Sequence, residues 1–299
     1  MSNNKHLWAA VSAYTIWGTF PLFLKQLTGF PAYTILFYRI LFASLFGIMI
    51  IAFFMRDKLR AEWRQWKQME KKTQWSVARV MLGGGLLLSV NWLLYIYVVN
   101  NINIQSASFA YMLCPIITAL LGALILKEKL LKHHWLAIVL GLLSCVLLSI
   151  IEPSNTLFSL TIACSYAFYL IIQKYAAGVN RVILLTGQMS LSILVIAITF
   201  WLAHIETPPH PFVLSMTAIM ALVFTMLPLL LNLFSLQGLS SGTVGFLMYI
   251  NPLMNFIVAF VFFREKSTPV HLAAYAIVLI AILFYNKERL NNLLSPKPE

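Results

Sequence analysis

The chain has 299 residues, of which 61% are hydrophobic and only 10% are charged. A soluble protein of this composition would expose far more apolar surface than water tolerates, so the composition places the chain in a lipid bilayer. The formal net charge of +12 is carried by Lys and Arg residues in short loops between apolar runs. Because they form no single stripe, we expect membrane lipid and no nucleic acid as their partner.

Ten apolar segments follow one another along the chain, and each approaches the length needed to cross the hydrocarbon core. Turn residues separate them, for example at Pro208 to Pro211. The sequence therefore predicts an all-α integral membrane protein with ten transmembrane helices. The approximate ranges are 6–27, 31–55, 76–100, 104–126, 133–151, 156–176, 180–203, 212–236, 241–263 and 269–286.

The longest connection, residues 56–75, places four apolar side chains three or four residues apart among Arg and Lys. This spacing predicts an amphipathic helix on the cytoplasmic surface of the membrane. A solvated basic linker is the alternative, because four apolar residues at helical spacing can arise by chance. The four residues are Leu59, Trp63, Trp66 and Met69.

Orientation follows from the basic residues on alternate loops. With a cytoplasmic N-terminus, seventeen Lys and Arg residues fall inside and only Arg264 and Lys266 fall outside. This bias predicts a multi-pass protein of the cell (inner) membrane with both termini cytoplasmic.

The two halves of the sequence resemble each other. A shift of 137 residues places Phe109 on Phe246, Pro115 on Pro252 and Glu128 on Glu265. Near the start of each half, Ser12 to Trp17 is similar to Cys164 to Tyr169 with a shift of 152. Repeats of five helices have opposite orientations because five is odd. We expect two inverted repeats, residues 1–152 and 153–299, an architecture associated with alternating access around a site near the midplane.

Aromatic and neutral polar side chains recur at helical spacing on several segments. Tyr14 and Trp17 share one face, and Asn91 and Tyr95 lie one turn apart. Polar groups in lipid need partners, so these faces should turn into the bundle and suit an amphipathic solute. Any single Asn could equally bond to a neighbouring helix. The candidate substrate-binding residues are Tyr14, Trp17, Asn91, Tyr95, Tyr111, Tyr166, Asn232, Tyr249 and Asn251.

Two cations and two prolines form a second set of candidates. Arg39 lies eight residues beyond Pro31, about 12 Å by helical rise; it either binds carbonyl ends of neighbouring helices or lines a vestibule. Lys25, near a helix end, either snorkels to the interface or joins that vestibule. Pro115 and Pro252 stand at equivalent positions of the two repeats, which favours a hinge over a simple kink.

All nine acidic residues lie in loops, tails or helix ends. Proton-driven carriers commonly use a carboxylate or His inside the bundle, so we expect facilitated flux, exchange or coupling through substrate charge. Glu128 and Glu265 are the mirrored exceptions to test, and local ion pairs or cap contacts are their expected role. No constellation typical of a metal, a cofactor or an active site stands at membrane depth.

Several of these stretches carry a family resemblance across essentially the whole chain. Trp17-Gly18, Arg39 and Ala43 resemble the EamA-type members of the drug/metabolite transporter superfamily. Residues 91–95 and 247–252 are similar to the RarD-type branch of chloramphenicol or drug permeases. The resemblance implies ten helices around a cavity lined by the first, third, fourth, sixth, eighth and ninth.

These observations predict a permease for a small organic solute, such as an amphipathic metabolite, an amino acid or a drug, working by alternating access. A membrane receptor or scaffold without transport, and an intramembrane enzyme, are the alternatives. The resemblance is not specific to a substrate. The direction of transport stays open, and so does assembly into a homo-oligomer.

Overall fold

The computed structural model describes residues 3–127, 130–176, 178–235, 238–239, 244 and 247–287. Within these ranges the secondary structure is helical and contains no strand. Eight helices are long and apolar enough to cross a membrane, and two further apolar helices are shorter. The protein is therefore an α-helical, multi-pass membrane protein.

The first half of the chain forms one long helix after another, with short turns between them. A 3₁₀ turn, Lys25–Leu27, extends the first helix. The helices are α1 (Asn3–Leu24), α2 (Ala32–Phe54), α3 (Arg56–Gln68), α4 (Lys71–Asn101), α5 (Ile104–Ile125) and α6 (Lys132–Ile151).

The second half repeats this pattern with one interruption. A π-helical turn, η3 (Leu222–Met226), joins α9 to α10 within a single apolar segment. The predicted segment 241–263 is described only in part, around α12. The helices are α7 (Pro153–Gln173), α8 (Arg181–Leu202), α9 (Pro211–Ala221), α10 (Leu227–Ser235), α12 (Ile250–Val261) and α13 (Pro269–Tyr285).

The boundary after α3 differs from the sequence-based expectation. Helix α4 begins at Lys71, five residues before the predicted start at residue 76. Residues 71–75 contain no Gly or Pro, and Lys and Gln are good helix formers, so the helix continues beyond its apolar part. Only the Arg56–Gln68 part of the predicted amphipathic loop forms a separate helix, and its side chains are not buried.

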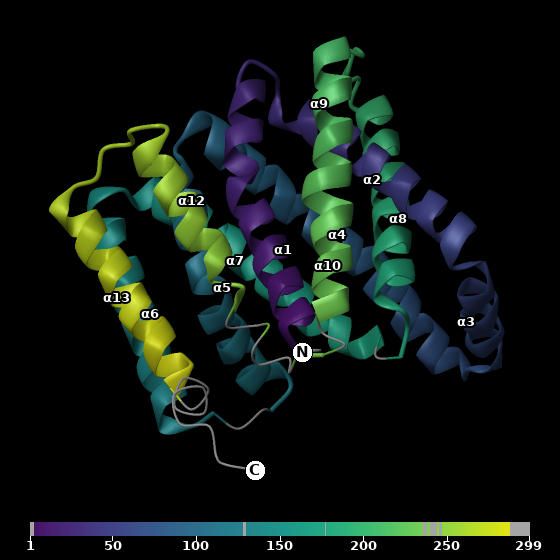
Figure 1. Ribbon diagram of the computed structural model, residues 1–299, viewed down its shortest axis with the longest axis horizontal. Helices are drawn as coiled ribbons and strands as arrows, with labels where there is room; N and C mark the ends of the chain where they lie inside the picture. Colours follow the sequence, from purple (N-terminus) through teal and green to yellow (C-terminus); the bar gives the residue numbers. More distant parts are fainter. Residues whose placement is uncertain are drawn as a thin grey trace.

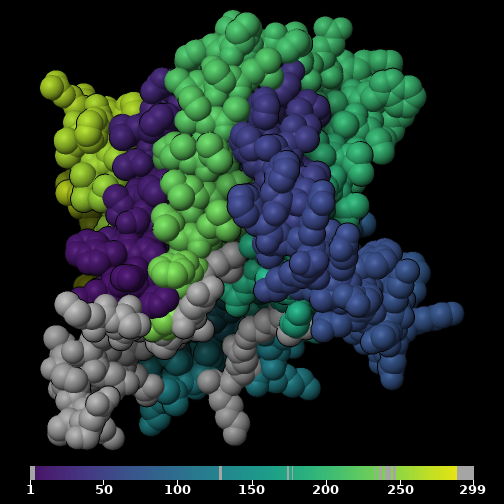
Figure 2. Space-filling model, turned by 45° about the vertical axis from the view of Figure 1, so that its right-hand side comes forward, coloured from purple at the N-terminus to yellow at the C-terminus, as the bar shows by residue number. Residues whose placement is uncertain are grey.

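Helix contacts divide the core of the bundle into two groups. In the first group, α7 packs against both α4 and α5; in the second, α1 packs against both α10 and α12. Helix α2 packs against α8, and α6 packs against α13 at the edge of the bundle opposite α3 (Figure 1). Figure 2 shows the continuous α9–η3–α10 helix between α1 and α2.

Apolar side chains cover the outward faces of the bundle. On α6, Val139, Leu142 and Val146 are each more than half exposed, and on α13 Leu283 is 53% exposed. In water such a continuous apolar surface would be costly, whereas acyl chains solvate it at no cost. These faces contact membrane lipid.

Small residues allow close approach of neighbouring helices inside the bundle. At Gly85 of α4, an added Cβ atom would lie 2.6 Å from the backbone carbonyl oxygen of Gln188 on α8. Van der Waals packing at such points holds helices together where lipid offers no hydrophobic driving force. The α4–α8 contact therefore depends on glycine at this position.

Candidate functional site

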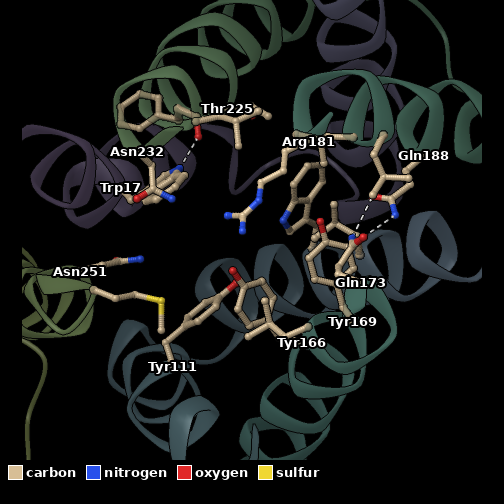
Figure 3. Close-up of a pocket in the computed structure, with 18 of the residues that line it drawn as sticks. Trp17, Tyr111, Tyr166, Tyr169, Gln173, Arg181, Gln188, Thr225, Asn232 and Asn251 are labelled. Atoms are coloured by element: carbon tan, nitrogen blue, oxygen red, sulfur yellow. Dashed lines mark hydrogen bonds between the residues drawn. The ribbon is translucent and has the colours of Figure 1, made fainter. Parts of the chain in front are cut away.

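A cavity of about 730 Å³ lies between the two helix groups. Figure 3 shows Trp17 and Asn232 on one side of it, with Tyr111 and Tyr166 across from them. The cavity extends from Phe20 in the interior to the turn that holds Gly178 and Arg181, which we call the Arg181 end. Its volume falls within the range of sites for organic ligands.

Most of the sequence-predicted site residues line this cavity, together with one of the two vestibule candidates and one of the two hinge prolines. Tyr14, Asn91, Lys25 and Pro115 do not line it. The predicted residues that do are Trp17, Arg39, Tyr95, Tyr111, Tyr166, Asn232, Tyr249, Asn251 and Pro252.

Trp17 is fixed by an irregularity in the helix opposite. Pro228 has no N–H group to donate to the carbonyl of Phe224, four residues earlier, and the π turn lies at this point. The Trp17 indole Nε1 donates to that carbonyl oxygen at 2.8 Å. The Phe224 carbonyl, which receives no N–H from Pro228, thus fixes the orientation of the Trp17 indole at the cavity.

Tyr14 acts one turn before Trp17, behind the cavity wall. Its side chain is buried, and its hydroxyl donates to the Oδ1 atom of Asn232 at 3.0 Å. The Tyr14 and Trp17 rings are 5.6 Å apart. Tyr14 therefore does not line the cavity itself. It positions Asn232, which does.

Asn91 holds the other helix group together. It is fully buried, and its Nδ2 atom donates to the carbonyl oxygen of Ile162 at 2.8 Å and to Ser165 Oγ at 3.2 Å. Its Oδ1 atom accepts from the Tyr111 hydroxyl at 3.0 Å. In the structure Asn91 therefore bonds to neighbouring helices and does not line the cavity.

An aromatic wall covers one side of the cavity. The rings of Tyr95 and Tyr111 are 5.4 Å apart, and those of Tyr111 and Tyr166 are 5.8 Å apart. Phe20 on α1 stacks with Tyr95 at 5.9 Å. Such faces favour a solute with an apolar body.

Arg39 reaches this wall from α2. Its side chain is buried, and its Cζ atom lies 4.5 Å from the ring centroids of both Phe20 and Trp92. Its Nη2 atom donates to Thr225 Oγ1 at 3.3 Å. Lys25, in contrast, lies outside the cavity with its Nζ 5.9 Å from the ring centroid of Phe263.

Sequence reasoning missed several residues of the lining. Gln173 and Gln188 join α7 to α8 through two reciprocal amide hydrogen bonds of 3.2 and 3.3 Å. Arg181, expected only as a loop charge, stands at the first position of α8 and borders the cavity. Gln188 carried a usable signal, because an amide in the middle of an apolar segment needs a partner inside the bundle.

The opposite end of the bundle, which we call the Glu265 end, joins the two groups. Both carboxylate oxygens of Glu265 accept backbone N–H groups at the start of α5, from Ile104 at 2.8 Å and from Gln105 at 3.1 Å. The Gln105 side chain also bonds to Ser267. A carboxylate at a helix N-terminus stabilises the free donors there. This is the cap contact expected for Glu265; its mirrored partner Glu128 lies outside the described residues.

Three kinds of polar group remain for a bound molecule. The Arg39 guanidinium offers donors, the Asn251 Oδ1 atom has no hydrogen-bond partner among the described residues, and the Tyr111 hydroxyl, which donates to Asn91, can still accept. Among the described residues, no group of three or more His, Cys, Asp and Glu side chains is arranged to hold a metal. The cavity is suited to binding an organic molecule through aromatic faces and a few polar contacts.

Sequence comparison gives relatives along the whole bundle. The chain is 30% identical over 279 residues to an uncharacterized transporter of Pseudomonas aeruginosa, covering 92% of this chain and 91% of the relative. It is 28% identical over 280 residues to the protein RarD of Escherichia coli strain K12, covering 92% of each. The uncharacterized transporter YojE of Bacillus subtilis is 26% identical over 280 residues.

Structure comparison and a family model agree with these relatives. One crystal structure of a protein matches with a TM-score of 0.61 and 16% identity, covering 95% of this chain and 98% of that one, which shows a shared fold. The model of the EamA-like transporter family matches residues 4–150 and again residues 154–287. The predicted resemblance is confirmed: the chain belongs to the EamA-like transporter family, with RarD proteins among its relatives.

Proposed function

We propose that this membrane transporter carries a small organic solute with an apolar body across the inner membrane by alternating access. The observation that carries the proposal is the cavity between the two helix groups, which reaches the surface at the Arg181 end. At the Glu265 end the groups are joined through Glu265, Gln105 and Ser267. A site that is open to one side and closed to the other is one of the two states that alternating access requires.

The helix contacts support two inverted five-helix repeats. In the ten-helix scheme, α1, α2, α4, α5 and α6 correspond in order to α7, α8, the α9–α10 helix, α12 and α13. Exchanging the halves turns the contact of α1 with α10 into that of α7 with α4, and the contact of α1 with α12 into that of α7 with α5. Both partners of each exchange are present. The two family-model matches divide the chain at the same place, between residues 150 and 154.

The charge bias assigns the two ends to the two sides of the membrane. The Arg181 end belongs to the basic set of loops, so it faces the cytoplasm, as do both termini. The Glu265 end then faces outward. In the proposed mechanism, a cavity that opens at the Arg181 end belongs to the state that is open to the cytoplasm.

Energy coupling through a buried carboxylate is not part of the proposal. No Asp or Glu stands among the described residues that line the cavity, and Glu265 is occupied by two N–H groups. We propose facilitated flux, exchange, or coupling through substrate charge. In proteoliposomes with an imposed pH gradient and the membrane potential held at zero, neither the wild type nor Glu128→Gln should accumulate solute above equilibrium, with or without a protonophore. Accumulation that collapses with the protonophore and is lost in the variant would show proton coupling.

Transport itself is tested with the purified full chain. Solutes that raise its melting temperature are selected first, because a ligand that binds the folded state stabilises it. Labelled forms are then offered to proteoliposomes, where we expect saturable uptake and exchange with unlabelled solute. Binding without uptake or exchange by any stabilising solute would favour the receptor alternative.

A further inference from the structure

Arg39 is a buried cation without a counter-charge. Its side chain is 5% exposed, and no described Asp or Glu forms an ion pair with it. A charge at membrane depth is costly unless it finds a partner, and such residues commonly mark the path of a substrate. Arg39 lines the cavity, so its missing partner has a place to bind.

The hydrogen bonds of Arg39 do not include the helix-end carbonyl groups that the structural alternative requires. A guanidinium has five N–H donors, and among the described residues its only acceptor is the Thr225 hydroxyl. No described backbone carbonyl accepts from it, and its Nε atom is buried without a partner. Arg39 therefore does not serve as a clamp on helix ends.

The surroundings hold the guanidinium plane still and leave donors free. The rings of Phe20 and Trp92 lie 4.5 Å from Cζ, at stacking distance, and Thr225 fixes one terminal nitrogen. Rings that stack on the face of a guanidinium do not use its edge donors. A fixed fork of N–H donors matches the two oxygens of a carboxylate.

The other residues that line the cavity indicate the net charge and the apolar character of its ligand. Arg39 and Arg181 line it, and no described acidic residue does, so its electrostatic sign is positive. Arg181 stands at the surface and Arg39 in the interior, so one charge acts at depth. The aromatic wall formed by Tyr95, Tyr111 and Tyr166 adjoins this charge.

We propose that Arg39 is the anion-binding residue of the cavity, and that the transported solute is an aromatic or other apolar molecule with one carboxylate. This inference rests on the proposed function and specifies its substrate class. The carboxylate would bind the free edge of the Arg39 guanidinium, while the apolar body lies against the tyrosine wall. The solute supplies the counter-charge that the described residues do not provide.

The test compares matched probes on the purified full chain. The probes are 1-naphthylacetate, the neutral 1-naphthylacetamide and 1-naphthyl phosphate, and affinity is measured from the dependence of melting temperature on ligand concentration. We expect the carboxylate to bind the wild type at least about tenfold more tightly than the amide, the factor typical of one hydrogen-bonded charge. Tighter binding of the phosphate than of the carboxylate would overturn the assignment of a singly charged anion.

Variants then place this preference on Arg39. In Arg39→Gln the carboxylate and the amide should bind alike, while Lys25→Gln, which removes a cation outside the cavity, should keep the wild-type preference. Arg39→Lys keeps the charge and loses the planar fork, so it should keep only part of the preference. An Arg39→Gln protein that still prefers the carboxylate overturns the proposal. If that variant does not fold, an unchanged preference in Arg39→Lys counts against the planar fork.

The anion site and the transport function can be disproved independently of each other. Equal binding of carboxylate and amide to the wild type would overturn the anion site, even if other solutes were taken up into proteoliposomes. Absence of uptake of every stabilising solute would contradict transport, even if the carboxylate preference depended on Arg39. The two readouts therefore separate the two claims.

Discussion

The two three-helix groups share one plan of contacts but differ in how their side chains are used. In the α4–α5–α7 group, the central hydrogen-bonding residue, Asn91, is fully buried. In the α1–α10–α12 group, α1 bonds to the helix opposite through Trp17, which lines the cavity, and through the buried Tyr14. Similar helix contacts therefore do not imply similar side-chain roles, because Asn91 is buried away from the cavity whereas Trp17 lines it.

The two groups also differ in the number of prolines within their helices. Pro21, Pro228 and Pro252 lie in the helical segments of the α1–α10–α12 group, and each lacks the N–H that would bond to the carbonyl four residues earlier. Those carbonyls belong to Trp17, Phe224 and Met248, which all line the cavity. In the α4–α5–α7 group, Pro115 lies inside α5 and lacks the N–H that would bond to the carbonyl of Tyr111, which also lines the cavity, and Pro153 is the first residue of α7. Because Trp17 lines the cavity and Asn91 does not, we expect substitution of Trp17 in the α1–α10–α12 group to change transport and substitution of Asn91 in the α4–α5–α7 group to change stability.

The largest effect is expected from Trp17→Ala. Removing the indole takes away a wall of the cavity, and uptake should fall at least about tenfold, equivalent to ~1.4 kcal/mol of binding. Uptake is measured per folded molecule in proteoliposomes. Trp201→Ala is the matched control, because that Trp is 76% exposed on the outside of the bundle. Equal uptake by the two variants would move the solute path elsewhere.

Asn91→Ala should mainly destabilise the protein. The substitution leaves Tyr111 and the Ile162 carbonyl without their partner, which costs about 1–2 kcal/mol for interhelical bonds in a membrane. Denaturant unfolding of the purified protein measures this loss. Asn101→Ala removes an exposed Asn that bonds within its own helix and serves as control. A stable Asn91→Ala protein with strongly reduced uptake would contradict this prediction, because it would give Asn91 a role in transport.

Glu265→Gln should weaken the contact that joins the groups at the Glu265 end. A carboxylate at a helix N-terminus contributes about 1 kcal/mol, so the open state at this end should become about fivefold more populated. The readout is the labelling rate of a cysteine placed at Ser106, which is buried in the structure. Glu206→Gln, in an exposed loop, is the control. An unchanged rate would show that Glu265 does not hold this end closed.

The smallest effect is expected from Pro228→Ala. The restored N–H group competes with the Trp17 indole for the Phe224 carbonyl, which favours a regular helix over the π turn. Stability should rise by up to about 1 kcal/mol, the net contribution of the restored helix hydrogen bond, while turnover falls. Melting temperature and uptake are compared on the same preparation. A simultaneous loss of both would indicate a purely structural proline.

Sequence reasoning was strongest where a feature depends on one segment alone. Hydropathy locates the eight long spans, and helical spacing selects Trp17 and Tyr95, because both depend on local composition and periodicity. Placing Asn91 requires knowledge of its neighbour on α7, and periodicity does not identify the partner helix. The contribution of Arg181 to the cavity likewise depends on how the α7–α8 turn packs. The aromatic nature of the cavity could be predicted from the sequence, whereas the full set of residues that line it could not.

The central claim is that the two groups separate at the Glu265 end during transport. The direct test is a disulfide between cysteines at Gln105 and Ser267, whose side chains are in contact, in a background where Cys114, Cys145 and Cys164 are replaced. Alternating access predicts that oxidation stops uptake, that reduction restores it, and that the stabilising solute still binds the oxidised protein from the Arg181 end. Each single-cysteine variant should be insensitive to the oxidant. Full uptake by the cross-linked protein would contradict the account.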